Sequence, residues 1–338
     1  MDLSTTYMGF KLPHPLMPGA SPLTDNLDNV RKLEDAGAPA IVMRSLFEEQ
    51  IVAEQISISD AIDTPSEAIA EAVTFFPDPE GFILGAHEYL EQVRKIKDAV
   101  DVPVIASLNG TTKGGWLQYA DLIQQAGADG LELNVYTLAT DPNVTGDQIE
   151  RQTLELAAEV KKTLRIPIAV KLSPFYSSIP NIAMRLDDLK VDGLVIFNRF
   201  YQPDIDPEAL EVKRALQLSD SSELLLRLRW LAVLSGRINA PMAVTGGVHT
   251  TLDAIKSIMA GAGVVQMVSG LLKNGPRHLQ KLRVELQQWM EANEFASIEK
   301  MRGNMSLRHS PNPGAYERAN YMQILQTWSG WRTIGWTQ

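Results

Sequence analysis

The chain has 338 residues, with 31 Lys or Arg against 41 Asp or Glu, so its formal net charge is -10 with histidine neutral. Hydrophobic residues make up 45% of it, a globular composition that can bury a large core. The lack of a Lys/Arg run argues against nucleic acid or an anionic membrane as the main partner, and the absence of cysteine excludes disulfides, thiolate metal sites and cysteine nucleophiles in this chain.

The N-terminal segment and the hydropathy of the chain give an expectation about location. The opening "MDLSTTYMGF" has no basic stretch followed by an apolar one, so it does not resemble a secretory signal. No apolar run reaches about 18 residues, the length that a membrane-spanning helix needs. We therefore expect a cytoplasmic protein without a membrane partner.

Eight short apolar strands are predicted, each followed by an amphipathic, helix-like segment. In chain order the strands lie at residues 14–21, 39–45, 102–110, 129–136, 166–174, 191–199, 240–248 and 261–270. The helix after the first strand has Thr24 and Asp25 as candidate N-cap residues and Gly37 as a candidate stop. A long insertion, 47–101, separates the second strand from the third.

The composition of these strands predicts the fold class. The runs are continuous and β-branched rather than alternating, which indicates parallel strands buried on both faces. Eight such strands separated by helices favour an α/β protein with a closed (β/α)8 TIM barrel over a doubly wound open sheet. We expect the barrel at 1–285 and a C-terminal extension, 286–338, packed on it. The extension would consist of a helix and an aromatic-rich tail containing "WSGW".

Polar and small residues stand at the predicted strand ends, where a TIM barrel has its active site. In chain order these are Ala20 and Ser21, Arg44 and Ser45, Ser107 and Asn109, Asn134, Lys171, Asn198, Gly246 and Gly247, and Ser269 and Gly270. One polar residue at a strand end carries little information. Residues converging from all the strand ends would form a polar ring around the barrel mouth.

Two glycine-containing turns follow the seventh and eighth strands, as "TGGV" and "VSGL". Backbone N–H groups at a helix N-terminus attract an anion, and the loops after these two strands are the frequent phosphate site of TIM barrels. A plain tight turn is the alternative for either motif alone. Two such turns in the two expected places favour a phosphate site.

Lys171 and two asparagines are the other candidates for function. A lysine at the tip of a buried strand is costly to bury without an anion or a function, although its ammonium could also extend to solvent. Within the barrel mouth it could stabilise negative charge on a bound ring. Asn134 and Asn198 each offer a donor and an acceptor, which suits an amide-containing ring, with a satisfied core amide as the alternative.

These residues carry a family resemblance. The segments "HPLMPGAS", "LELNV", "AVKLSP", "GLVIFN", "VTGGV" and "VVQMVSG", in this order and spacing, resemble the dihydroorotate dehydrogenases and most closely their soluble class 1 branch. The resemblance covers about residues 1–285. It implies an FMN-binding barrel that oxidises dihydroorotate to orotate in pyrimidine biosynthesis.

The resemblance also implies roles for individual residues. Asn134 and Asn198 match substrate-binding asparagines, Lys171 matches the lysine that stabilises reduced flavin, and Thr137 falls on the position of the catalytic base. No metal is expected. The residues that match contacts of the family with FMN are Ala20, Ser21, Arg44, Ser107, Asn134, Lys171, Gly246, Gly247, Ser269 and Gly270.

Several positions depart from the family pattern. Thr137 replaces the family's cysteine or serine, and Ala139 replaces a substrate-binding asparagine. The segment 74–83, "TFFPDPEGFI", lacks the asparagines that the family has there, and Val268 replaces a glycine. Because a polar ligand would lose hydrogen-bond partners, we expect dihydroorotate to be a poor substrate.

The sequence therefore predicts an FMN-dependent oxidoreductase that passes hydride to flavin N5 while a residue of the fourth strand's loop removes a proton. The alternatives are a flavin barrel that acts on a different C–C bond and a flavin-binding subunit without catalysis. A tRNA-reducing flavin barrel would need a basic RNA-binding face, which a net charge of -10 does not favour. We expect a small-molecule substrate and a homodimer. Any iron–sulfur relay would need a partner subunit, because this chain has no cysteine.

Overall fold

A computed structural model of the chain gives the fold. It describes residues 1–51, 85–110, 113–135, 137–200, 202–213, 216–317 and 320–327. The segment 74–83 and the tail motif "WSGW" at 328–331, both singled out in the sequence, lie outside these residues.

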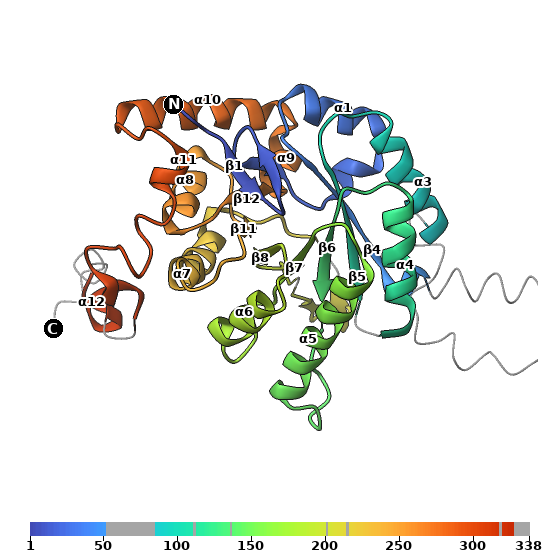
Figure 1. Cartoon of the computed structure of the whole chain (residues 1–338). Helices are drawn as coiled ribbons and strands as arrows, with labels where there is room; N and C mark the ends of the chain where they lie inside the picture. Colours follow the sequence, from blue (N-terminus) through green and yellow to red (C-terminus); the bar gives the residue numbers. More distant parts are fainter. Residues whose placement is uncertain are drawn as a thin grey trace, which may run out of the picture.

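Eight parallel strands form a TIM barrel, as predicted (Figure 1). Their hydrogen-bonded order is β3-β12-β11-β8-β7-β6-β5-β4, and the two ends of this order, β3 and β4, are in contact. Each of the eight predicted strands is confirmed; seven have shorter bounds, and β4 has the predicted length but begins and ends two residues later. They are β3 Leu16–Pro18, β4 Ile41–Phe47, β5 Val104–Gly110, β6 Gly130–Val135, β7 Ile168–Lys171, β8 Gly193–Ile196, β11 Met242–Thr245 and β12 Val264–Met267.

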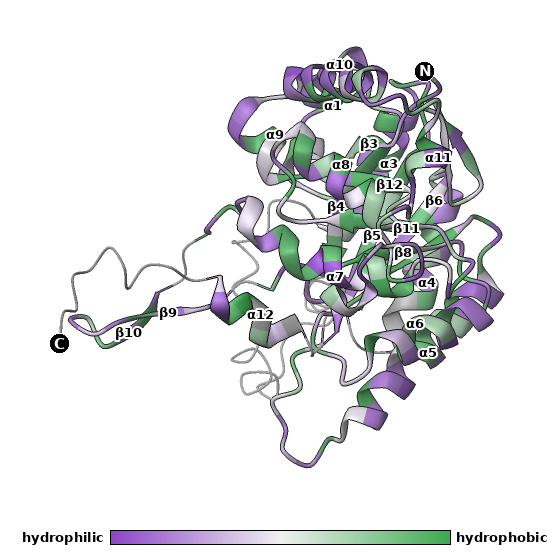
Figure 2. Ribbon diagram, turned by 90° about the vertical axis from the view of Figure 1, so that its left-hand side faces the viewer, coloured by the Kyte–Doolittle hydropathy of each residue, from purple (hydrophilic) through white to green (hydrophobic). Residues whose placement is uncertain are grey.

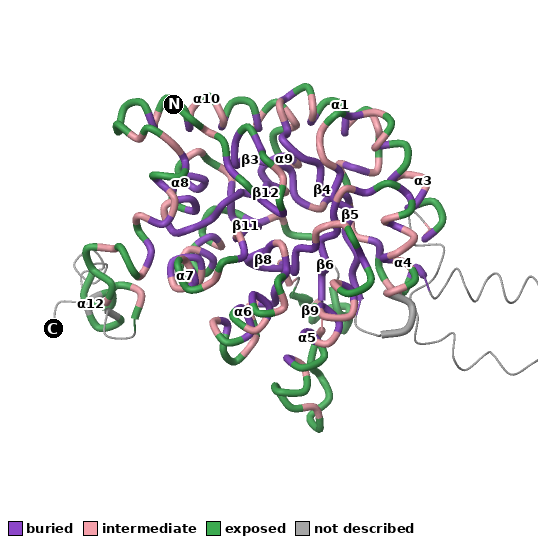
Figure 3. Tube along the Cα trace, in the orientation of Figure 1, coloured by how far each residue is buried: buried purple, intermediate pink, exposed green. Residues whose placement is uncertain are grey.

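Helices surround the strands, and their inner faces close the core between the two layers (Figures 1 and 3). The barrel strands are buried except toward the end of β4, where Phe47 is exposed, whereas the helices alternate between buried and exposed positions, as amphipathic helices do. The helices of the barrel are α1 Leu27–Asp35, α3 Ala86–Lys97, α4 Lys113–Gln125, α5 Gly146–Thr163, α6 Ile179–Asp188, α7 Leu224–Leu234, α8 Thr251–Ala260 and α9 Ser269–Asn274.

The start of α1 differs from the prediction. Residues Pro22–Asp25 form a 3-10 turn, and Asn26 caps α1 by accepting a hydrogen bond from the Asp28 N–H. Thr24 instead accepts a bond from the Arg44 N–H at 2.8 Å, so it ties this turn to β4. The predicted stop is confirmed, because Gly37 follows the last turn with a φ of +90°, a conformation that favours glycine.

A hairpin that the sequence did not predict closes the bottom of the barrel. It consists of β1 Thr5–Tyr7 and β2 Phe10–Leu12, and it places Tyr7 and Met8 in the apolar cluster inside the strands. Gly193, the first residue of β8, lies against the Tyr7 ring, where an added Cβ would be 2.9 Å from Tyr7 Cε2. The opposite end, at the carboxyl ends of the barrel strands, is not covered by this hairpin.

The expected boundary between the barrel and the C-terminal extension lies within a helix that packs on the barrel. Helix α10, Arg277–Ala292, contains residue 285 and packs against α1, α8 and β3. Helices α11, Ile298–Met301, and α12, Asn320–Gln326, follow it. The expected division at 285/286 therefore falls inside one helix.

A second hairpin stands in the connection between β8 and α7. It consists of β9 Asp204–Asp206 and β10 Glu211–Lys213, and it extends away from the barrel (Figure 2). Across the described ranges, none of the helices has both the length and the hydrophobicity that a bilayer span requires.

Candidate functional site

A cleft opens at the carboxyl ends of the barrel strands and gathers most of the predicted ring. Its volume is about 380 Å³, within the range of about 300–1,000 Å³ that is typical of small-molecule sites. Its predicted lining residues are Ala20, Ser21, Arg44, Ser45, Asn109, Asn134, Lys171, Asn198, Gly246, Gly247 and Ser269. Residues as far apart in the chain as Ala20 and Ser269 are thus brought to one site by the parallel strands.

Lys171 ends β7 and forms the floor of the cleft. Its ammonium donates to Glu132 Oε1 at 2.5 Å, and the Lys171 side chain is 8% exposed. The second oxygen, Glu132 Oε2, accepts from Gln266 Nε2 at 2.8 Å across the barrel. The predicted cation therefore has a buried anionic partner, which sequence reasoning missed.

Asn109, Asn134 and Lys171 stand at one level of the barrel, because the register pairs Asn109 with Asn134 and Asn134 with Lys171. Asn198 Nδ2 donates to Asn134 Oδ1 at 2.8 Å. Within the described part of the chain, Asn134 Nδ2 and Asn198 Oδ1 have no protein partner. The pair therefore presents one donor and one acceptor to the cleft.

Ser21 supplies an unsatisfied polar atom at the opposite wall. Its Oγ is buried and has no partner among the described residues, although buried polar atoms in native proteins are nearly always hydrogen-bonded. Arg44 lines the same wall, where its Nη1 donates to Asp25 Oδ2 at 2.8 Å. A polar ligand that reaches Ser21 would satisfy this hydroxyl.

Ser107, a predicted flavin contact, lies behind the wall and is fully buried. Its Oγ is 2.7 Å from Ser45 Oγ, and Ser45 is the residue that lines the cleft. Tyr89 fixes the Ser107 backbone, since its hydroxyl accepts from the Ser107 N–H and donates to the Ser107 carbonyl. In the described structure, Ser107 thus supports the cleft through Ser45.

The two glycine turns stand side by side at one end of the cleft. Gly246 and Gly247 both have positive φ angles, +86° and +81°, which favour glycine. An added Cβ on Gly247 would be 2.5 Å from the Leu224 nitrogen, so a side chain does not fit there. Gly270 packs against the other turn, where a Cβ would be 2.9 Å from the Val248 carbonyl oxygen. Both turns therefore keep their backbones close to each other.

Ser219 joins these turns and was missed in the sequence. Its Oγ accepts from the Gly247 N–H at 3.4 Å, and its own N–H donates to Ser269 Oγ at 3.1 Å. His249 Nε2 is 3.1 Å from Ser219 Oγ, and burial together with the nearby Lys273 lowers the pKa of His249. The cap signal "LSDSSE" before α7 could have placed Ser219 near the barrel mouth.

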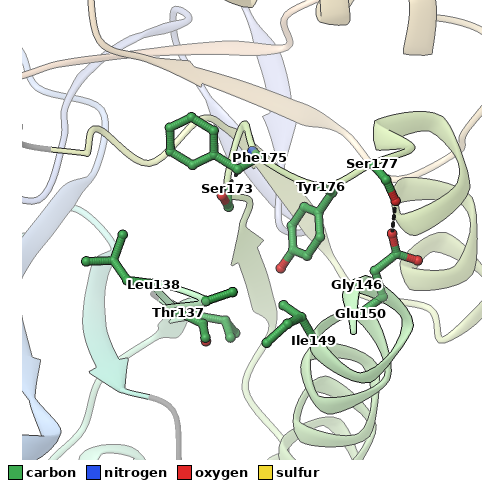
Figure 4. Close-up of a pocket in the computed structure, with 11 residues that line it drawn as sticks. Thr137, Leu138, Gly146, Ile149, Glu150, Ser173, Phe175, Tyr176 and Ser177 are labelled. Atoms are coloured by element: carbon green, nitrogen blue, oxygen red, sulfur yellow. Dashed lines mark hydrogen bonds between the residues drawn. The ribbon is translucent and has the colours of Figure 1, made fainter. Parts of the chain in front are cut away.

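Thr137 lines a second pocket, of about 330 Å³, beside the cleft (Figure 4). This pocket lies between the loop after β6 and the loop after β7. Leu138, Ala139, Ile149 and Phe175 make most of its wall apolar. Thr137 does not line the main cleft in the described structure, and its assignment as a base remains a prediction.

Charged side chains do not form a metal site in the part of the chain that the structure describes. No group of three or more His, Asp or Glu residues is arranged there to hold a metal ion. The arrangement instead suits an organic ligand with a polar ring, which would meet the asparagines and Lys171, and an anionic end, which would meet the glycine turns.

Comparisons with known proteins find similar sequences along most of the chain. A family model described as dihydroorotate dehydrogenase matches residues 81–290. The catalytic subunit of dihydroorotate dehydrogenase B (NAD(+)) from Thermoplasma volcanium is 27% identical over 311 residues, covering 89% of this chain and 98% of that protein. The corresponding subunit from Methanocaldococcus jannaschii is 26% identical over 281 residues, covering 81% and 88%. The NAD-dependent dihydropyrimidine dehydrogenase subunit PreA of Escherichia coli is 23% identical over 325 residues, covering 89% and 76%.

Proposed function

The chain belongs to the dihydroorotate dehydrogenase family of oxidoreductases, and from this premise we propose that it binds FMN and oxidises a CH–CH bond of a dihydropyrimidine ring. The observation that carries the proposal is the convergence of Lys171, Asn134 and Asn198 with the two glycine turns in one cleft. Two of the relatives are named for dihydroorotate and one for dihydropyrimidines, which supports a dihydropyrimidine substrate, and dihydroorotate is the first to test.

The residues of the cleft fit FMN. The unsatisfied Ser21 Oγ, the Lys171 ammonium and the Asn134 amide offer partners to a polar ring. The turns at Gly246–Gly247 and Ser269–Gly270 offer backbone N–H groups to a phosphate, except for the Gly247 N–H, which donates to Ser219 Oγ. When bound, FMN supplies the hydride acceptor for the reaction.

The asparagine pair supports a pyrimidine-like substrate. Asn134 Nδ2 can donate and Asn198 Oδ1 can accept, while their mutual hydrogen bond fixes both amides. A dihydropyrimidine ring carries adjacent C=O and N–H groups, which need one donor and one acceptor. Such a ring would leave neither amide unpaired, and this matters because unpaired buried polar groups are costly.

Lys171 and Thr137 are the proposed catalytic residues. Lys171 would hold a positive charge beside the ring on which negative charge develops. Thr137, which lines the pocket beside the cleft, would accept the proton of a substrate that extends from the cleft into this pocket, and its hydroxyl would need water or a neighbour to take that proton onward. Tyr176 borders the same pocket as Thr137 and donates or accepts a hydrogen bond with Thr153 at 2.9 Å. Burial raises the pKa of Tyr176, which makes it a poor base.

The electron acceptor is proposed to reside on another subunit. Two of the compared relatives are described as catalytic subunits and a third as subunit PreA. This chain has no cysteine, so an iron–sulfur relay would belong to a partner protein. We also propose a homodimer and a cytoplasmic location. A flavin-binding subunit without catalysis is not favoured, because the compared relatives are dehydrogenases.

The cofactor assignment is tested by comparing FMN with riboflavin, which lacks the phosphate. We expect the purified protein to be yellow, to release FMN on heating, and to rebind FMN at least about tenfold more tightly than riboflavin, a difference of about 1.4 kcal/mol. The measurement is quenching of flavin fluorescence by the protein. Failure to bind either flavin would overturn the cofactor, and equal affinities would overturn the phosphate site at the glycine turns.

A further inference from the structure

The ammonium group of Lys171 is paired with the carboxylate of Glu132, and this pair suggests a role for Glu132. Glu132 stands two residues before Asn134 on β6, so its side chain enters the barrel on the same face. It is 1% exposed and lies below the floor of the cleft. Burying a carboxylate is costly unless it is paired and hydrogen-bonded.

Both carboxylate oxygens of Glu132 are engaged by groups on other strands. Lys171 Nζ on β7 donates a hydrogen bond to Oε1 at 2.5 Å, and Gln266 Nε2 on β12 donates one to Oε2 at 2.8 Å. Since β6 and β12 are separated by three strands in the barrel order, the Gln266 bond crosses the interior. Glu132 is therefore fixed from two sides and in turn fixes the ammonium of Lys171.

We propose that Glu132 is a positioning residue that holds the Lys171 ammonium at the cleft floor and sets the net charge beside the flavin ring. The proposal rests on the proposed function for the identity of the ring. Lys171 alone would favour the anionic reduced flavin, and a carboxylate 2.5 Å from its Nζ offsets part of this effect. Glu132 thus makes the bound flavin less easily reduced than Lys171 alone would make it.

Glu132→Gln removes the negative charge while keeping the size of the side chain. Its amide oxygen can still accept from Lys171, but its NH2 group would then face the NH2 of Gln266. Gln266 Oε1 is buried and has no partner among the described residues. A flip of the Gln266 amide would present this oxygen to the new NH2, so the substitution can be accommodated.

The primary readout is the two-electron reduction potential of the bound flavin, measured at one pH for all variants. We expect Glu132→Gln to raise the equilibrium constant for flavin reduction at least about tenfold, which is about 30 mV for a two-electron couple. Glu132→Asp keeps the negative charge and should stay near the wild-type potential. An unchanged potential in Glu132→Gln would overturn the role of Glu132 in setting the charge.

Asp187→Asn is the matched control for losing a buried carboxylate. Asp187 lies at the end of α6 and accepts hydrogen bonds from the Asn239 and Ala240 N–H groups, away from the cleft. We expect this variant to lower stability without shifting the flavin potential. A shift equal to that of Glu132→Gln would show that general destabilisation moves the potential, and would overturn the inference.

A flavin-free measurement separates this inference from the proposed function. In urea unfolding of the apoprotein, Glu132→Gln and Lys171→Met should each lower the midpoint, and the double variant should recover much of the sum. If the wild type takes up no FMN, the proposed function fails and the setting of flavin charge fails with it. The urea cycle still decides whether Glu132 holds Lys171, and additive midpoint shifts would overturn that pairing.

Discussion

Three cations among the described residues line the cleft, namely Arg44, Lys171 and Arg199, and the first two differ in their partners. Arg44 donates to Asp25, and both side chains are partly exposed to solvent, at 26% and 20%. Lys171 is almost wholly buried and bonds to Glu132 at the floor. A charge in a drier site acts more strongly on a bound ring than a partly solvated one.

We therefore expect Lys171→Ala to slow the anaerobic reduction of bound flavin at least about tenfold, a loss of about 1.4 kcal/mol of transition-state stabilisation. Arg44→Lys keeps a cation on the wall, so its loss should be smaller. Stopped-flow absorbance gives both rates. Similar rates for the two variants would remove Lys171 from the proposed mechanism.

At the residue scale, the sequence was informative where a polar side chain ends a buried strand. Asn134, Lys171 and Asn198 were recognised in this way, because burial makes an unpaired polar residue conspicuous. Glu132 was not singled out, although it is also polar within an apolar strand. Ser219 comes from a loop, where serine is common and carries little signal.

His14, just before β3, is hydrogen-bonded to the segment that follows α1, and its titration makes the stability of the protein depend on pH. It precedes β3, and its Nε2 donates to the Gly37 carbonyl beyond α1 at 2.7 Å. Its Nδ1 is buried without a partner among the described residues. The pKa of His14 is lowered from 6.5 to about 4, chiefly by burial and in addition by the positive charge of Arg283, against the opposing effect of the Gly37 bond.

The sign of the pH effect follows from this lowered pKa. Between about pH 6.5 and about pH 4 the unfolded chain binds a proton at His14 that the folded chain does not, so stability falls as pH falls. The loss attributable to His14 by about pH 4 is on the order of 3 kcal/mol. His14→Gln keeps an N–H donor and removes the titration. Its free energy of unfolding should therefore fall less steeply in this window, as measured by urea unfolding. Parallel pH profiles for the two proteins would contradict the assignment.

At the scale of elements, long apolar strands were predicted well and short mixed ones were not. Continuous β-branched runs in the sequence indicate the eight barrel strands. Hairpin β1–β2 has three-residue strands with polar threonines, and it is stabilised by contacts with distant strands such as β8. Periodicity over so few residues cannot predict a strand, because tertiary packing decides its conformation.

The whole molecule makes the site by bringing the ends of its strands to one face. Most of the predicted ring lines one cleft, while Ser107 stands behind it and Thr137 lies in the neighbouring pocket. The fold class thus predicted which residues would gather. It could not predict which hydroxyls would reach the ligand, because loop conformation and side-chain packing determine that.

The most direct test of the account is the anaerobic reduction of the FMN-loaded protein by dihydropyrimidines, dihydroorotate and dihydrouracil first. We predict that the visible absorption of the flavin bleaches with at least one of them. Bleaching by dihydroorotate should be slower than the rate of about 10 per second that is typical of enzymes, because Ala139 removes a polar partner and Thr137 is a weak base. A flavin that dithionite bleaches but that stays oxidised with every dihydropyrimidine would contradict the proposed function.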